Sequence, residues 1–128
     1  MNTVNETRMI FRTGRDAAVI PAGAEVTLTG NGGVKVSDCR SIRIYCASRE
    51  SSACPVTLVL MAAEGEETLA PLDRIVLAPG EKATRAYDVP GTSLILSVQA
   101  DRGGGAASLD AILYGYGSRG IFGGTARG

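Results

Sequence analysis

The sequence contains no histidine and no tryptophan, and aromatic residues make up only 5% of its 128 residues. Histidine is the most common general base and metal ligand in proteins, and tryptophan offers the largest ring for stacking on a sugar or a base. No histidine is present to activate a serine, and no Ser-x-x-Lys pattern replaces it. These absences favour a non-enzymatic protein, and we expect no catalytic residue in it.

An excess of charge of either sign is also lacking, because 13 lysines and arginines balance 13 aspartates and glutamates. A neutral chain has no overall field that would draw it to nucleic acid or to an anionic membrane. No stretch approaches the roughly 20 apolar residues of a spanning helix, and residues 1–8 lack the basic start and apolar run of a secretory signal. We therefore expect cytoplasmic synthesis without a signal peptide, and neither a nucleic-acid nor a membrane partner.

Cysteine is scarce and odd in number, with Cys39, Cys46 and Cys54. Three thiols without histidine leave a tetrahedral zinc shell one ligand short. Cys46 and Cys54 flank the polar residues 47–53, so a hairpin could bring them within bridging distance, although the expected compartment favours free thiols. We expect reduced cysteines, no metal and no cofactor.

Acidic residues gather at one place, where Glu64, Glu66 and Glu67 lie near Asp73. They could offer oxygen ligands to calcium, or they could form a solvated turn between strands. Calcium loops usually alternate acidic and carbonyl positions, and this cluster lacks that register. The solvated turn is the favoured interpretation.

Glycine and proline are plentiful, at 17 and five residues, and they separate short apolar runs. Apolar and polar residues alternate with a period of two from about residue 8 to residue 114, as in residues 41–46, where Ile42 and Ile44 share a face. Residues 56–61 are apolar at nearly every position, which predicts a central strand with both faces covered. The pattern predicts an all-β fold, a two-layer antiparallel β-sandwich of eight or nine short strands.

Two groups of turn residues predict hairpins. Residues 30–33, Gly-Asn-Gly-Gly, tolerate the positive φ that a tight hairpin needs between strands at 24–29 and 34–36. Residues 78–81, Ala-Pro-Gly-Glu, combine a proline that presets φ with a glycine that accepts a left-handed conformation. The strands at 72–77 and 82–89 should therefore form the clearest hairpin of the chain.

Three segments carry a resemblance to known proteins: Leu-Ala-Pro-Gly-Glu at 77–81, Tyr-Asp-Val-Pro-Gly at 87–91, and the Leu-Ile-Leu-Ser-Val strand at 94–98. Over residues 24–114 the order of strands and turns resembles small jelly-roll-like β-sandwich modules of bacterial and phage structural or surface proteins. The resemblance implies a jelly-roll-like sandwich and carries over no functional residue.

The two ends differ in composition from the middle. We expect a flexible N-terminal arm at residues 1–8, a β-sandwich domain at 9–114, and a flexible glycine-rich C-terminal arm at 115–128. Residues 115–120 match the glycine spacing of a dinucleotide-binding turn, but no helix can start there and no second strand follows. The arm instead carries one apolar pair that it cannot bury alone, which predicts partner binding. The candidate residues are Tyr116, Arg119, Ile121 and Phe122.

Tyrosines and arginines supply the other candidates for a binding surface. Tyrosine can stack on a sugar ring and donate a hydrogen bond, although half-buried packing is its commoner role. Arginines near one strand could face a carboxylate or a phosphate, or could be solvated charges that protect a sheet edge. These residues are Tyr45, Tyr87, Tyr114 and Tyr116, together with Arg40, Arg43 and Arg49.

Two functional hypotheses fit these features. The first is a structural assembly subunit, most concretely a viral or phage capsid or tail accessory or decoration protein. Its partners would be other protein subunits in a homo-oligomer or larger lattice, and it would be located in the virion. The alternative is a carbohydrate-binding β-sandwich module that uses the tyrosines as its platform. Fold alone does not separate the two.

Overall fold

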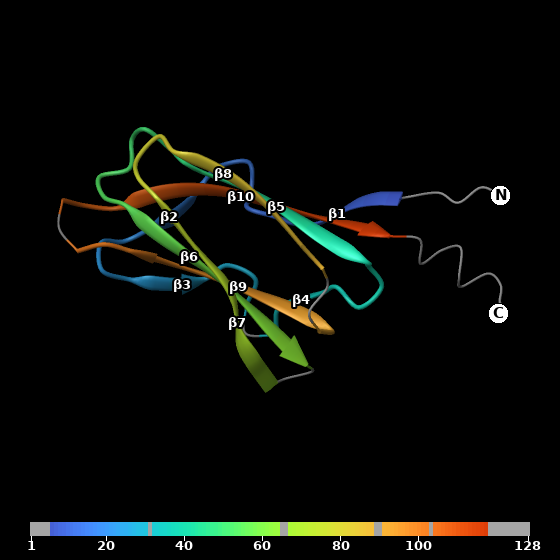
Figure 1. The fold of residues 1–128 in the computed structure, drawn as a ribbon. Helices are drawn as coiled ribbons and strands as arrows, with labels where there is room; N and C mark the ends of the chain where they lie inside the picture. The colour runs from blue at the N-terminus through green and yellow to red at the C-terminus, as the bar shows by residue number, and fades with distance from the viewer. Residues whose placement is uncertain (1–5, 31, 65–66, 89–90, 103, 118–128) are drawn as a thin grey trace, which may run out of the picture.

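The computed structural model describes residues 6–30, 32–64, 67–88, 91–102 and 104–117, and all its regular elements are strands (Figure 1). In chain order they are β1 Glu6–Arg12, β2 Ala18–Ile20, β3 Glu25–Thr27, β4 Val34–Lys35, β5 Ser41–Ser48, β6 Val56–Glu64, β7 Glu67–Leu77, β8 Lys82–Asp88, β9 Ser93–Ala100 and β10 Ala107–Gly117. Within these residues no helix of a length and hydropathy that would span a membrane is found.

The strands form two antiparallel sheets. The first sheet has the order β1-β10-β5-β8, with β2 also paired to β10, and the second has the order β3-β9-β6-β7, with β4 also paired to β9. The strand pairs are nested along the chain: β1 pairs with β10, β3 with β9, β5 with β8 and β6 with β7. Successive pairs belong alternately to the first and to the second sheet. This nesting is the jelly-roll arrangement.

The expected all-β, two-layer antiparallel sandwich is confirmed, with ten strands in place of eight or nine. The additional strands are short, since β2 has three residues and β4 has two. Figure 1 shows the two layers, with β10 and β5 in one and β9 and β6 in the other.

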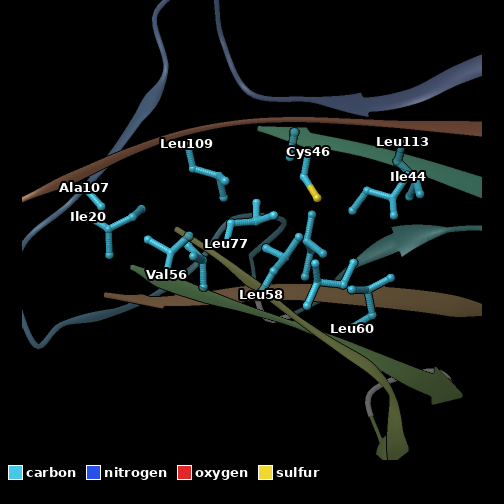
Figure 2. Packing of buried hydrophobic residues seen from close by; sticks show 14 of the residues in the cluster. Ile20, Ile44, Cys46, Val56, Leu58, Leu60, Leu77, Ala107, Leu109 and Leu113 are labelled. Carbon is cyan, nitrogen blue, oxygen red and sulfur yellow. The ribbon is translucent and has the colours of Figure 1, made fainter. Parts of the chain in front are cut away.

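The core lies between the two sheets and follows from the alternation. In β5, Ile42 and Ile44 are fully buried and point toward the second sheet, whose inner face carries Leu58, Leu60 and Leu96, also fully buried. Figure 2 shows the side chains of Ile44, Leu58 and Leu60 filling this space. The outer face of β6 is only half-buried, so the expectation that both its faces are covered is wrong.

Both expected hairpins are absent, although the turn chemistry is present. Gly80 has a φ of 84° and the Glu81 amide donates to the Ala78 carbonyl at 2.9 Å, but β7 pairs with β6 and β8 pairs with β5. Residues 78–81 therefore carry the chain from one sheet to the other. Residues 30–33 likewise connect β3 and β4, which both pair with β9 and not with each other. Turn residues determine where the chain reverses, whereas the partner strand is chosen by burial across the whole core.

The expected domain limits, residues 9 and 114, fall inside strands. The pairing of β1 with β10 begins at Glu6 opposite Gly117 and continues with Arg8 opposite Gly115. Residues 115–117, expected in the flexible arm, therefore belong to the sheet. The rest of both expected arms, residues 1–5 and 118–128, lies outside the described residues.

Candidate functional site

The outer face of the first sheet gathers most of the aromatic candidates. Because Ile42, Ile44 and Leu113 point inward, the intervening positions of β5 and β10 point outward. Register pairs Tyr45 with Ile112, Arg43 with Tyr114 and Ser41 with Tyr116. We call this surface the tyrosine face, formed by Arg43, Tyr45, Ile112, Tyr114 and Tyr116.

The side chains of the tyrosine face contact one another. The rings of Tyr45 and Tyr114 meet edge to face, with centroids 5.6 Å apart and planes at 88°. The guanidinium carbon of Arg43 lies 5.9 Å from the centroid of the Tyr116 ring, within cation–π range. A hydrogen bond with Tyr45, followed by burial, raises the pKa of Tyr116. The rings therefore brace each other and do not lie in one plane.

At one end of this face lies a hollow of 490 Å³, where β5 begins and where β8 and β10 end. We call it the arginine hollow. Its lining residues are Arg40, Ser41, Arg43, Ala86, Asp88, Tyr116 and Gly117.

The charged side chains of the arginine hollow have no ion-pair partner within the described part of the chain. The side chains of Arg40, Arg43 and Asp88 form no ion pair or hydrogen bond with another described residue. Arg40 is held in place through its backbone, since its amide donates to the Tyr116 carbonyl at 2.8 Å. The hollow thus offers two arginines, one aspartate and one tyrosine to a ligand.

A second, mainly apolar hollow of 260 Å³ continues along the same face, over β5 between β8 and β10. Tyr45 and Ile112 lie in its lining with Lys82, Thr84 and Asp110. The two hollows together recess the outer face of the first sheet along β5.

Tyr87 and Arg49, also singled out from the sequence, have internal roles. Tyr87 is half-buried, and its hydroxyl donates to the Asp73 carboxylate at 2.6 Å, which links β8 of the first sheet to β7 of the second. This bond lowers the pKa of Asp73, and burial together with the same bond raises the pKa of Tyr87. Arg49 makes two hydrogen bonds to Asp110, at 2.9 and 3.1 Å. Neither residue belongs to the arginine hollow.

The proposed partner-binding residues separate into two groups. Tyr116 lies in β10 and lines the arginine hollow, whereas Arg119, Ile121 and Phe122 lie outside the described residues. Asp88 was missed from the sequence, because only its pairing opposite Ser41 brings it to the hollow. No local signal marks that long-range contact.

Cysteines and acidic residues form no metal site in the described chain, where no group of three or more potential ligands is found. The hairpin expected to bring Cys46 and Cys54 together does not form, because β5 and β6 belong to opposite sheets. The Cys46 thiol contacts the Ala83 carbonyl at 3.7 Å and the Cys54 thiol contacts the Gly105 carbonyl at 3.4 Å. Burial raises the pKa of Cys46 to about 11.

Neither a family model nor a curated protein matches this sequence. Solved structures do resemble its fold. A chain of the disulfide-linked pili that form Bacillus endospore appendages aligns with a TM-score of 0.53 and 13% identity, over 92% of this chain and 95% of its own. A chain of the T13 particle of infectious bursal disease virus aligns with a TM-score of 0.54 and 14% identity, over 91% of this chain and 32% of its own.

A xylan-binding domain aligns with a TM-score of 0.40 and 13% identity, over 89% of this chain and 87% of its own, which is too low to support an argument. The pilus and virus chains are similar enough in structure to compare with this chain, but not in sequence. Their likeness establishes the β-sandwich fold of this chain.

Proposed function

We propose that this chain is a non-enzymatic structural subunit that assembles with other protein subunits, including copies of itself. The observation that carries the proposal is the shared fold. Two structures that align with TM-scores above 0.5 over more than nine-tenths of this chain come from ordered assemblies, a pilus and a virus particle.

The tyrosine face supports this proposal on chemical grounds. Tyrosine, arginine and methionine are enriched in protein interfaces relative to the rest of the surface. Met9, which is 46% exposed, pairs with Tyr114 at the edge of the face, and Arg43 and Tyr116 extend it into the arginine hollow. Such a surface suits contact with another protein.

The most concrete form of the proposal is a viral or phage capsid or tail accessory or decoration subunit, located in the virion. Portal, capsid or tail genes beside the gene for this chain would support that form. A glycosidase or an export system in the same place would count against it.

Mass in solution tests the assembly proposal directly. Light scattering on the full chain, over a hundredfold range of concentration, should show a dimer or a larger species. A monomer at every concentration that also binds no neighbouring gene product would contradict the proposal.

A carbohydrate-binding module is the second candidate, favoured by the cluster of Tyr45, Tyr114 and Tyr116 on one face. The edge-to-face pair and the arginine over Tyr116 leave no flat row of rings, which favours the assembly proposal. Retarded migration in gels that contain a soluble polysaccharide, by a protein that stays monomeric, would instead support sugar binding.

A further inference from the structure

Two features of opposite charge lie at the same end of the sandwich, one on each sheet. The arginine hollow lies where β5 begins and where β8 and β10 end. The β6–β7 hairpin reaches this end on the second sheet, because Ala63 pairs with Ser93, the first residue of β9, which follows β8 closely along the chain. Its last pair is Glu64 opposite Glu67.

The described charges of both features lack an ion-pair partner among the residues that the structure describes. Arg40 and Arg43 outnumber Asp88 in the hollow and make no ion pair in the described part of the chain. Glu64 is exposed and has no ion pair with any described residue. The arginines of the hollow and the exposed Glu64 carry opposite charges, so each feature of one copy is complementary to the other feature of an identical copy.

We propose that the arginine hollow of one copy binds the Glu64 carboxylate, at the end of the β6–β7 hairpin, of a second copy. The inference rests on the proposed assembly function and names one of its contacts. Because both patches lie at one end, two copies related by a two-fold axis make the contact twice, each giving its hairpin to the other's hollow.

Opposite charges would orient the two copies relative to each other and speed their association. An exposed ion pair contributes little to affinity, whereas like charges placed opposite each other are strongly disfavoured. The tyrosine face beside the hollow supplies the apolar area. Asp88 opposes the incoming glutamate, so the contact is weaker with Asp88 than without it.

Exchange of charges tests the contact by sedimentation velocity on the full chain. The first variant carries Arg40→Glu and Arg43→Glu, and the second carries Glu64→Lys. Each alone should weaken self-association about tenfold or more, because equal charges then face each other. An equimolar mixture of the two should recover the association, since each hollow again meets a hairpin of opposite charge.

Matched controls reverse charges at the other end of the sandwich, with Arg102→Glu in the β9–β10 loop and Glu25→Lys at the start of β3. Both should associate as the wild type does. Asp88→Asn should tighten association and Asp101→Asn should not. If the charge-reversed pair fails to fold, Arg40→Gln with Arg43→Gln should weaken association and reduce its dependence on salt.

The outcomes separate this inference from the assembly proposal. If the arginine variant assembles as well as the wild type, or the mixture fails to recover, the hollow is not the binding site, although the protein is still a subunit. If the wild type stays monomeric but binds a different acidic protein through the hollow, the second copy is the wrong occupant. If it binds neither, both proposals fail.

Discussion

Gly115 and Gly117 lie on the inner side of β10, where the segment before β5 packs directly on the strand. A Cβ on Gly115 would overlap the Cys39 sulfur, and a Cβ on Gly117 would lie 2.9 Å from the Arg40 backbone nitrogen. This close approach brings Arg40 to the rim of the hollow, where its amide bonds to the Tyr116 carbonyl. The glycines therefore position a candidate binding residue.

Replacing Gly115 with alanine should lower the free energy of unfolding by about 1 to 3 kcal/mol, because the added methyl group overpacks this contact. Gly32→Ala is the control, since a Cβ there meets no atom within 4 Å. Chemical denaturation measures both. Adding Cys39→Ala to the Gly115 variant should restore part of the loss, and an equal effect at Gly32 and Gly115 would contradict the packing argument.

At the scale of elements, β7 and β8 are edge strands of opposite sheets, and the Asp73–Tyr87 hydrogen bond joins them. The bond lowers the pKa of Asp73 from its ordinary value of 3.8, so the stabilisation is present above that pH and is lost as pH falls through the folded-state pKa. The pKa of Tyr87 is raised from 10.0, so its contribution is present below pH 10.0 and is lost as the pH rises further.

Tyr87→Phe should therefore destabilise the fold most between about pH 5 and pH 9, with a smaller difference from wild type outside that window. Removing this hydrogen bond to a charged group should cost about 1 to 2 kcal/mol at pH 7. Urea denaturation at a series of pH values measures the difference. Tyr114→Phe is the control for loss of a tyrosine hydroxyl outside this bond. A difference that is constant across the whole pH range would show that the bond makes no contribution.

Strands could be predicted from the sequence because alternation is a local property, but their partners could not. Tyr114 and Tyr116 are two residues apart in β10, so the sequence places them on the same face of the strand. Their meeting with Tyr45 and Arg43 depends on the pairing of β5 with β10, which are separated by four other strands along the chain. The end of β10 could not be predicted either, because a glycine required by close packing in a strand has the same sequence signature as one in a flexible arm.

At the scale of the whole molecule, one end of the sandwich carries both charged features assigned to assembly. The arginine hollow, the acidic hairpin end, the first residue of β1 and the last residue of β10 all lie there. Figure 1 shows β1 beginning and β10 ending on this side of the fold. The opposite end holds the β9–β10 loop, for which we propose no contact. An assembly built from this chain should therefore bury one end and expose the other.

Residues 118–128 follow Gly117, which lines the hollow, and we propose that Ile121 and Phe122, with Arg119, anchor this segment on a neighbouring subunit. Burying the two apolar side chains contributes about 3 to 6 kcal/mol to binding. The conformational entropy lost when a few residues become ordered offsets part of this contribution. Deleting residues 118–128, or changing Phe122 to serine, should weaken association about tenfold or more. The free energy of unfolding of the isolated subunit should not change, because the pairing of β1 with β10 ends at Gly117.

Sedimentation velocity and urea denaturation of the same samples separate these two effects, with Thr125→Ser as a control in the same segment. The shortened chain should keep the salt dependence that the arginine hollow imposes, since the two contacts use different forces. Association as strong as that of the wild type would show that residues 118–128 make no contact. Loss of stability together with association would instead mean that the segment belongs to the fold of its own subunit.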